Sequence, residues 1–357
     1  MKRIKVRTGK EYEVLIGQGL LAEAGNAIGE VCRGRRAVIV TDSNVAGYYA
    51  ETLSSALTQS GFTADTCIFP AGEEQKNAKT LFDIIGFIAD CRLTREDLVV
   101  ALGGGVTGDM AGLAAALYMR GIDYVQVPTS ILAAVDSSVG GKTAIDLPQG
   151  KNLAGAFYQP ALVIIDTDVF ESLPQRDYCS GFAEVIKYGM IEDPRILEQI
   201  RCLGKFDRSV QPELEELIAR CVEIKAAVVA EDEFEGGKRR LLNFGHTVGH
   251  AVEKETDYHV YHGEAVAIGM MKITEAAARN GRCDEDAPEA LREALKVFDL
   301  PAAAGTDRIQ IPNTKTLMKH IAMDKKNTDD GIYVVIPEHI GACVIEKMSM
   351  TELEEFL

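Results

Sequence analysis

The sequence predicts an α/β N-terminal domain with a mainly parallel sheet, followed by a mainly α-helical C-terminal domain. In the first half, short apolar runs rich in β-branched residues alternate with helical stretches, which is typical of parallel strands covered on both faces. In the second half, long helical spacing of apolar residues replaces these runs. The change near residue 178 predicts domains of residues 1–178 and 179–357.

Four apolar runs define the expected parallel sheet. Each is short enough for a buried strand, and they cover residues 36–42, 97–102, 124–127 and 161–165. An amphipathic helix is expected over residues 49–60, after the first strand. The second strand ends in Gly103-Gly-Gly-Val-Thr-Gly-Asp109, and a helix of small residues is expected over 110–119.

The second half is expected to contain long helices over residues 212–231 and 262–280. One stripe of the first helix collects Leu214, Leu217, Ile218, Cys221 and Val222. A strand is expected near the end of the chain, over residues 332–336, after a turn at 327–331 that is rich in Asn, Asp and Gly.

Composition and charge limit the class of protein. The 357-residue chain carries a formal charge of −16, so its surface is expected to repel nucleic acid and anionic membranes. No apolar run is long enough to span a bilayer, and the charged N-terminus lacks a signal-peptide pattern. The eight cysteines form no C-x-x-C pair, which indicates free thiols in a reducing compartment. We therefore expect a cytoplasmic protein whose ligand is a small anionic metabolite.

The glycine loop after the second strand predicts a Rossmann-like nucleotide site. Gly103, Gly105 and Gly108 form G-x-G-x-x-G, and the following helix would offer free N–H groups to a pyrophosphate. The same glycines also fit a tight strand–helix turn that binds nothing. The loop does not follow the first strand. Instead Asp42 ends an earlier strand, where its carboxylate could accept hydrogen bonds from a ribose.

Three of the six histidines lie within seventeen residues and predict a metal site. His246 and His250 are four apart, so they share one face of a helix, and His262 follows after a short loop. The three imidazoles could converge on zinc. Capped or core histidines are the competing interpretation, and spacing alone does not identify a distant carboxylate ligand.

Nine segments of the chain resemble the 3-dehydroquinate synthase family, in the order in which the family has them. The longest is Val135-Asp-Ser-Ser-Val-Gly-Gly-Lys-Thr-Ala-Ile-Asp146. The other eight are residues 72–76, 103–109, 128–132, 150–160, 183–189, 242–250, 262–270 and 324–326. Departures from the family pattern are few: Ser130 and Ser172 each replace a threonine, and Ala134 replaces a glutamine.

The resemblance implies three sets of site residues. Glu184, His246 and His262 would bind a divalent metal, zinc or cobalt, and His250 would contact substrate instead. NAD would be bound by Asp42, Glu73, Lys76, Gly104, Gly105, Val106, Asp109, Thr129, Ser130, Lys142, Lys151, Phe170 and Ser172. A phosphorylated sugar acid would be bound by His250 and by Asp136, Lys142, Lys151, Asn152, Lys187, Lys225, Arg239, Asn243 and Lys326, the last in preference to Lys325.

The resemblance also implies the reaction and the partners. In a homodimeric enzyme, 3-deoxy-D-arabino-heptulosonate 7-phosphate would be oxidised transiently by NAD, lose phosphate, be reduced again and close by an intramolecular aldol step to 3-dehydroquinate. Two other kinds of enzyme compete with this interpretation. One is another sugar-phosphate cyclase, such as 2-deoxy-scyllo-inosose synthase or an aminodehydroquinate synthase, and the other is a metal-dependent polyol or iron alcohol dehydrogenase that releases NADH. His250 and the set of lysines with Arg239 favour the dehydroquinate enzyme.

Overall fold

The chain forms two compact units. A computed structural model describes residues 1–203, 211–301, 312–323 and 331–357. Unit 1 consists of Met1–Leu173 and Gln211–Glu233, and unit 2 consists of Pro174–Val210 and Phe234–Leu357. The sequence alone assigned all residues after 178 to the second domain, whereas helix α7 (Gln211–Glu231) packs against strands β1 and β2 of unit 1. The chain therefore enters unit 2, returns to unit 1 for α7, and enters unit 2 again.

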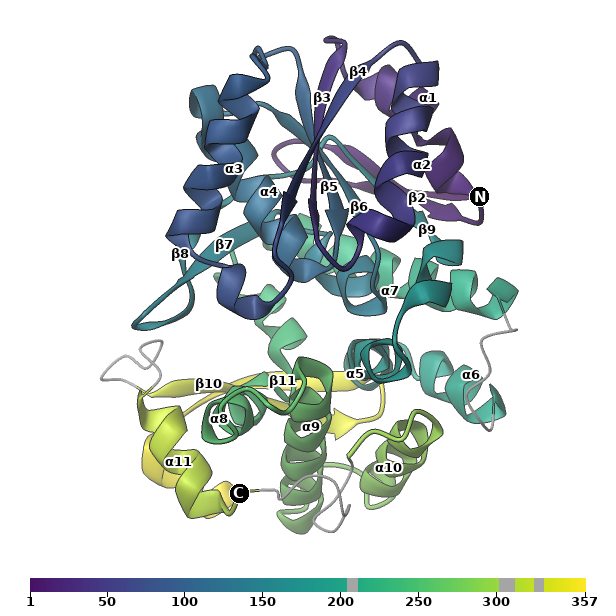
Figure 1. Cartoon of the computed structure of the whole chain (residues 1–357). Helices are drawn as coiled ribbons and strands as arrows, with labels where there is room; N and C mark the ends of the chain where they lie inside the picture. The colour runs from purple at the N-terminus through teal and green to yellow at the C-terminus, as the bar shows by residue number, and fades with distance from the viewer. Residues whose placement is uncertain (204–210, 302–311, 324–330) are drawn as a thin grey trace. The chain divides into compact units, whose positions relative to one another are not determined.

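Unit 1 is built on a seven-stranded sheet with the order β1-β2-β9-β6-β5-β3-β4 (Figure 1). All neighbouring strands are parallel except the antiparallel edge pair β1 and β2. The strands are β1 (Lys2–Val6), β2 (Tyr12–Gly17), β3 (Arg36–Asp42), β4 (Thr63–Phe69), β5 (Leu98–Gly103), β6 (Asp123–Pro128) and β9 (Leu162–Asp166). The predicted α/β fold with a mainly parallel sheet is confirmed, and the four predicted strands correspond to β3, β5, β6 and β9.

The register of the sheet brings three predicted site segments to one edge. Thr41 of β3 pairs with Leu102 of β5, and Gly103 pairs with Pro128 of β6. The carboxyl ends of these parallel strands therefore lie side by side, followed by Asp42, the glycine loop and Thr129. Ligands of open parallel sheets bind at this edge.

Helices cover both faces of this sheet (Figure 1). Helices α3 and α4 pack against each other, as do α1 and α2. A two-stranded antiparallel hairpin, β7 with β8, packs against α4. The bounds are α1 (Leu20–Val31), α2 (Ala46–Gln59), α3 (Ala78–Asp90), α4 (Gly105–Leu117), β7 (Lys142–Leu147) and β8 (Gly150–Phe157), with the short turns η1 (Glu73–Gln75), η3 (Ala133–Ser137) and η4 (Thr167–Ser172).

Unit 2 is mainly helical, with one antiparallel hairpin. Helix α9 packs against α5, α8, α10 and strand β10, and α5 is buried along nearly its whole length. The bounds are α5 (Gln175–Ile191), α6 (Arg195–Leu203), α8 (His246–Glu255), α9 (His262–Arg279), α10 (Ala287–Val297), α11 (Thr314–Met323), α12 (Met350–Phe356), β10 (Ile332–His339), β11 (Ala342–Met348) and the turn η5 (Lys238–Asn243). The expected helices at 212–231 and 262–280 and the strand at 332–336 are confirmed, while most of the turn expected at 327–331 lies outside the described residues.

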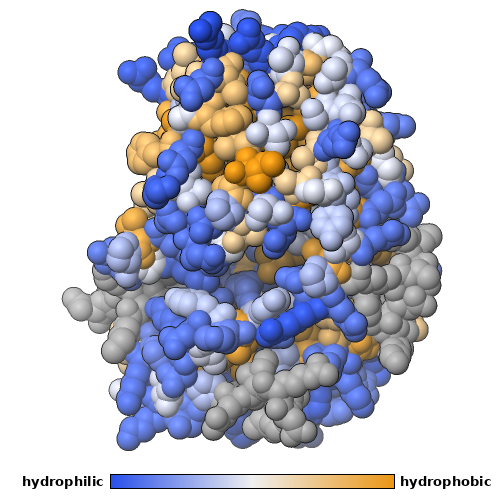
Figure 2. Space-filling model, in the orientation of Figure 1, coloured by the Kyte–Doolittle hydropathy of each residue, from blue (hydrophilic) through white to orange (hydrophobic). Residues whose placement is uncertain are grey.

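Hydrophilic side chains cover much of the face that Figure 2 shows, with apolar patches between them. Across the described part of the chain, no helix combines the length and apolar character needed to cross a bilayer.

Candidate functional site

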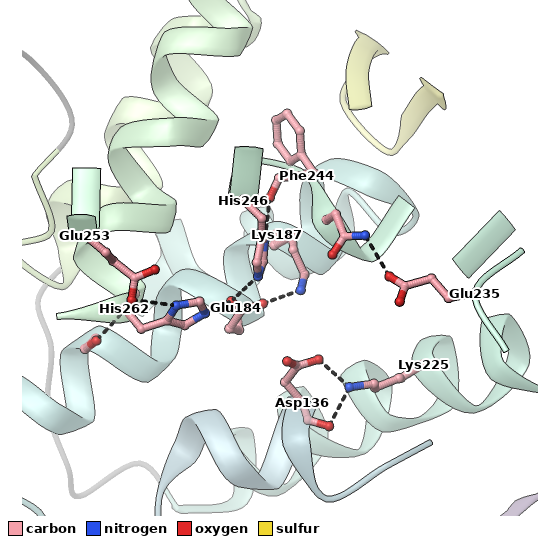
Figure 3. Close-up of polar contacts among 12 residues, drawn as sticks. Asp136, Glu184, Lys187, Lys225, Glu235, Phe244, His246, Glu253 and His262 are labelled. Carbon is pink, nitrogen blue, oxygen red and sulfur yellow. Dashed lines mark hydrogen bonds and ion pairs between the residues drawn. The ribbon is translucent and has the colours of Figure 1, made fainter. Parts of the chain in front are cut away.

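Three side chains from three helices of unit 2 meet at one point (Figure 3). Glu184 comes from the middle of α5, His246 begins α8, and His262 begins α9. The Nε2 atoms of His246 and His262 lie 3.5 Å and 3.4 Å from Oε1 of Glu184. Glu184 is fully buried. A buried carboxylate facing two imidazole nitrogens is a donor set that suits a divalent metal.

The spacing of these atoms fits a single small cation. In a tetrahedral site with bonds of about 2.0–2.1 Å, neighbouring ligand atoms lie about 3.3 Å apart. The two measured separations, 3.5 Å and 3.4 Å, are close to that value. Three protein ligands also leave one position for a substrate oxygen, as a catalytic metal site requires. The residues present therefore fit a zinc-like ion.

Glycines allow the three helices to approach closely enough. A Cβ atom on Gly263 would lie 1.8 Å from the backbone oxygen of Ser180 in α5, and one on Gly269 would lie 2.0 Å from the oxygen of Gly245. Gly245 itself has a φ of 80°, in the left-handed region. Any larger residue at Gly263 or Gly269 would force α9 away from α5 or α8. The glycines within the matching segments thus set the spacing of the ligands.

A charged clamp fixes the beginning of α9. Nε and Nη2 of Arg176, at the start of α5, donate to the two carboxylate oxygens of Glu264 at 2.8 Å and 2.7 Å. Glu264 also accepts from the backbone N–H of Tyr261 at 2.9 Å, and the Arg176 guanidinium lies 3.8 Å from the centre of the Tyr261 ring. A bidentate pair of this kind restrains orientation as well as distance. The clamp aligns the start of α9 with α5.

The electrostatic environments of the two metal-site histidines differ. Burial lowers the pKa of His246 to about 3, so its imidazole is neutral. Its Nδ1 lies 3.1 Å from the carbonyl oxygen of Phe244, which can only accept a hydrogen bond. The proton is therefore on Nδ1, and the lone pair of Nε2 faces Glu184. Burial also acts to lower the pKa of His262, but hydrogen bonds and charges from Glu184 and Glu253 outweigh it and raise the pKa to about 10.

The three histidines His246, His250 and His262 do not form a single metal-binding group. The His250 ring centre lies 5.5 Å from that of His246 and 6.2 Å from that of His262. Among the described residues, the groups whose ligand atoms lie within 4.8 Å are Glu184 with His246 and His262, and His250 with Glu253 and His262. The histidine spacing allowed three imidazoles to converge on one metal. The structure instead brings two imidazoles, those of His246 and His262, together with Glu184.

One predicted substrate residue of unit 2 contacts this group directly, and two others lie in the turn η5. Lys187 is almost completely buried and forms an ion pair with Glu184 one helical turn away. Arg239 is equally buried, in η5. Nδ2 of Asn243 donates to Glu235 at 2.8 Å. Lys326 and its neighbour Lys325 lie outside the described residues.

In unit 1, Asp42 links the end of β3 to the start of α4. Its Oδ1 accepts from the backbone N–H groups of Asn44 and Val45 at 2.9 Å and 3.2 Å, and its Oδ2 accepts from the Thr107 hydroxyl at 3.1 Å. Helix α4 begins at Gly105, so Val106 and Thr107 belong to its first turn. The first-turn N–H groups of a helix have no partner within the helix and can bind an anion.

Four other predicted nucleotide residues, Thr129, Ser130, Phe170 and Ser172, follow strands β6 and β9. The N–H of Thr129 donates to the Gly103 oxygen at 2.9 Å, and a Cβ on Gly104 would lie 3.7 Å from the Ser130 hydroxyl. Phe170 is buried in η4, and the Ser172 hydroxyl donates to the Val169 oxygen at 3.2 Å.

A second polar cluster of unit 1 contains five predicted residues. Nζ of Lys76 lies 2.6 Å from Oδ2 of Asp109 and donates to Oδ1 of Asn152 at 2.5 Å, and Nζ of Lys151 lies 3.3 Å from Glu73. Lys76 is buried. Burial raises the pKa of Asp109 to about 6, although the charge of Lys76 opposes this. The cluster holds a cation and carboxylates in a desolvated position, which is typical of functional sites.

Two further predicted residues of unit 1 form an ion pair in which the lysine is buried and the aspartate is partly exposed. Nζ of Lys225, on α7, donates to the backbone oxygen of Asp136 at 2.5 Å and pairs with its carboxylate (Figure 3). Lys142, at the start of β7, is exposed. The return of the chain to unit 1 thus brings Lys225 to Asp136, 89 residues away in the sequence.

Sequence reasoning missed Arg176, Glu264 and Glu253. Arg176 and Glu264 are 88 residues apart, and nothing in either segment points to the other. Glu253 follows His246 by seven residues and His250 by three, so it shares their face of a helix. That spacing is the signal that could have identified it.

The fold defines a class of α/β proteins in which a mainly parallel sheet is followed by a helical second unit, here with a candidate metal site. Solved structures of this fold include a 2-deoxy-scyllo-inosose synthase complexed with carbaglucose-6-phosphate, NAD+ and Co2+ (24% identity, 99% of each chain, TM-score 0.86). Another is the 2-epi-5-epi-valiolone synthase from Streptomyces hygroscopicus with NAD+ and Zn2+ bound (25% identity, 99% of this chain and 98% of that chain, TM-score 0.87). The glycerol dehydrogenase from Schizosaccharomyces pombe is a more distant neighbour (16% identity, 96% of this chain and 87% of that chain, TM-score 0.62).

Sequence comparison narrows this class to one family. Residues 66–180 match the family description "3-dehydroquinate synthase N-terminal" and residues 181–327 match "3-dehydroquinate synthase C-terminal". The 3-dehydroquinate synthase of Clostridium beijerinckii is 42% identical over 98% of this chain and 99% of its own. That of Caulobacter vibrioides is 44% identical over 98% of this chain and 95% of its own. The chain belongs to the 3-dehydroquinate synthase family.

Proposed function

We propose that the chain converts 3-deoxy-D-arabino-heptulosonate 7-phosphate to 3-dehydroquinate and inorganic phosphate. The observation that carries this proposal is the group of Glu184, His246 and His262, with separations of 3.5 Å and 3.4 Å, in a chain of the 3-dehydroquinate synthase family. The family membership supports the substrate, and the geometry of the group supports a metal-assisted oxidation of an alcohol.

Two cofactors belong to the proposal. NAD would supply a reversible hydride acceptor, and zinc or cobalt would supply Lewis-acid polarisation of the substrate alcohol. Glu184, His246 and His262 would hold the metal. The NAD residues would be those at the carboxyl edge of the sheet and in the Lys76 cluster, together with the hairpin lysines: Asp42, Glu73, Lys76, Gly104, Gly105, Val106, Asp109, Thr129, Ser130, Lys142, Lys151, Phe170 and Ser172. Solved structures of the same fold that are described with NAD+ and Co2+ or Zn2+ support this assignment.

The chain's own polar residues would bind and orient the substrate. Its phosphate and carboxylate are anions, and cations held in fixed positions bind such groups through charge-assisted hydrogen bonds. Arg239 and Lys187 are almost completely buried, so their interactions with an anion would be weakly screened. The proposed set is Asp136, Lys142, Lys151, Asn152, Lys187, Lys225, Arg239, Asn243, His250 and Lys326.

The proposed reaction consists of five successive changes in the substrate. One secondary alcohol is oxidised to a ketone, which acidifies the neighbouring carbon and allows phosphate to leave. Reduction of the ketone returns the hydride, the sugar ring opens, and an intramolecular aldol step closes the carbocycle. The substrate thus yields one product and one phosphate with no net change of NAD. Fixed positions for the phosphate and the reacting alcohol supply the required orientation.

We further propose a cytoplasmic homodimer with a small-molecule substrate and neither nucleic acid nor membrane as a partner. All eight cysteines are free thiols, which supports a reducing compartment. The formal charge of −16 supports the exclusion of polyanions. Analytical ultracentrifugation tests the dimer: a sedimenting species with twice the chain mass is expected, and a monomer at micromolar concentration would contradict it.

One assay tests the reaction. The chain is incubated with the heptulosonate phosphate, NAD and zinc, and phosphate and NADH are followed together, with Glu184→Gln as the control variant. We expect one phosphate per substrate consumed, no net accumulation of NADH, and no turnover by the variant. Accumulation of NADH without phosphate would identify a dehydrogenase instead. Turnover of glucose 6-phosphate in place of the heptulosonate would identify a different sugar-phosphate cyclase.

A further inference from the structure

The His262 imidazole lies between two carboxylates and faces each through a different nitrogen (Figure 3). Its Nε2 lies 3.4 Å from Oε1 of Glu184, and its Nδ1 lies 3.4 Å from Oε1 of Glu253. Glu253 is only 5% exposed and lies on α8, on the face that also carries His246 and His250.

A neutral imidazole carries one N–H and one lone pair, on different nitrogens. Both nitrogens of His262 face carboxylates, but a metal ion held with Glu184 and His246 would take the lone pair of Nε2, so the one remaining proton would be on Nδ1, where Glu253 can accept it. The other nitrogen, Nε2, then presents its lone pair beside Glu184 and His246. Metal-bound histidines commonly donate their second N–H to a carboxylate, which fixes the tautomer and the ring and raises the basicity of the ligand.

We propose that Glu253 is a positioning residue that fixes the orientation and tautomer of His262 and thereby strengthens metal binding. The proposal rests on the metal site of the proposed function. The backbone of His262 is already restrained, because the Arg176–Glu264 clamp and the close contact at Gly263 fix the start of α9. What remains variable is rotation of the imidazole about its side-chain torsions, and Glu253 restrains it.

The backbone of Glu253 is itself held firmly. Its carbonyl oxygen accepts from the N–H of Tyr258 at 2.8 Å, where α8 ends. The carboxylate is therefore presented from a closed helical turn rather than from a loose loop. Groups that orient a ligand need rigid support of this kind.

A second cation bound by His250, Glu253 and His262 is the competing interpretation, because their ligand atoms lie within 4.8 Å of one another. It would need Nδ1 of His262 as a ligand. An imidazole that binds the first metal through Nε2 can bind another through Nδ1 only after losing its remaining proton, and imidazole N–H groups are very weak acids. Because His262 can offer one lone pair to a metal while it keeps its other N–H, it favours one ion per chain, with Glu253 as the acceptor of that N–H.

The same helix offers a matched control. Glu255, two residues after Glu253, contacts Nε2 of His320 at 2.6 Å. This is also a carboxylate–histidine pair, yet neither residue belongs to the group of Glu184, His246 and His262. A Glu→Gln change at either position removes one negative charge from α8 with almost no change in side-chain volume.

The experiment compares zinc binding by the full chain, Glu253→Gln and Glu255→Gln. Dissociation constants are measured by competition with a chromophoric chelator, and the visible spectrum of the cobalt form reports the ligand geometry. We expect Glu253→Gln to bind zinc about 10–100-fold more weakly, with a changed cobalt spectrum. Glu255→Gln is expected to match the wild type in both measurements. Thermal unfolding of the metal-free proteins shows whether each variant is folded, and Glu253→Asp, which retracts the carboxylate, replaces Glu253→Gln if the latter is not.

Each remaining outcome counts against the proposal in a distinct way. Unchanged zinc affinity and an unchanged cobalt spectrum in Glu253→Gln would remove the role of Glu253 but leave the metal site intact. Two zinc ions per wild-type chain, of which Glu253→Gln loses one, would make Glu253 a ligand instead. Failure of the wild-type chain to bind zinc would overturn the metal site itself, and with it the role of Glu253.

Discussion

Gly263→Ala tests whether the close approach of α9 to α5 sets the spacing of the proposed metal ligands. The new Cβ would lie 1.8 Å from the Ser180 backbone oxygen, whereas contacts under 3.0 Å are essentially never seen. Both partners are parts of helices rather than ends of flexible side chains, so α9 must move away by at least about 1.2 Å. His262 is the preceding residue and moves with it.

The size of this movement decides the effect on the metal. The Nε2–Oε1 separation of His262 and Glu184 is 3.4 Å, and a retreat of about 1.2 Å would open it to about 4.6 Å. A zinc ion with bonds of about 2.1 Å can touch two atoms no more than about 4.2 Å apart. We therefore expect zinc affinity to fall by at least about tenfold, and the overpacked helices to lose about 1–3 kcal/mol of unfolding free energy.

Urea unfolding and chelator competition measure these two effects, with Gly86→Ala as the control. Gly86 lies on the exposed face of α3, and a Cβ there would meet nothing within 4 Å. Alanine at that helical position is expected to stabilise the chain by about 0.5–1 kcal/mol without altering zinc binding. If Gly263→Ala unfolds at the wild-type urea concentration and binds zinc with wild-type affinity, the helix approach does not set the ligand spacing.

Three further predictions concern the metal group and the Lys76–Asp109 ion pair of unit 1. Glu184→Gln removes a proposed ligand and the negative charge that pairs with the buried Lys187. Zinc affinity should therefore fall by more than the ~100-fold that is typical of changes to residues that only support the ligands. Wild-type affinity in a competition assay would exclude Glu184 as a ligand. Exhaustive chelation should abolish phosphate release, and zinc or cobalt should restore it; turnover by protein that elemental analysis shows to be metal-free would rule out a metal requirement. Lys76→Met should lower the unfolding free energy by about 3–5 kcal/mol near pH 8, because it leaves Asp109 buried without its cation. The pKa of Asp109 is raised to about 6 in the folded chain, so its contribution to stability is present at low pH and is lost as the pH rises through that value. Without Lys76 this loss is larger, so the difference between variant and wild type should grow from pH 4 to about pH 8, and an equal difference at every pH would contradict the assignment.

Local patterns predicted the interior of the sheet well and its periphery poorly. The strand β3 has the bounds expected from its β-branched run, Arg36–Asp42, because fully buried strands are continuously apolar. The edge strand β1 is short and alternates charged with apolar residues, so nothing distinguished it from a loop. Helix α4 was expected from residue 110 but begins at Gly105. Gly108 therefore lies inside the helix and not in a turn, where a Cβ would lie 2.6 Å from the side-chain oxygen of Gln126.

The candidate site was also predicted only in part from local sequence patterns. Histidine spacing identified the region of α8 and α9, but it could not supply Glu184, because α5 is buried on almost every side and its periodicity marks no functional face. Only the family resemblance singled out that residue. The pairing of Lys225 with Asp136 and of Arg176 with Glu264 depends on how the chain returns between units and packs its helices, over 89 and 88 residues. Contacts at such separations are a property of the tertiary fold and leave no signal in local periodicity.

The central claim is that Glu184, His246 and His262 hold one divalent metal ion. Crystals of the chain grown with zinc and NAD, measured on both sides of the zinc absorption edge, test it directly. We predict one anomalous peak about 2.0–2.2 Å from a Glu184 carboxylate oxygen and from Nε2 of His246 and of His262. A zinc peak bound by other residues, or these three side chains around no peak at all, would contradict the claim.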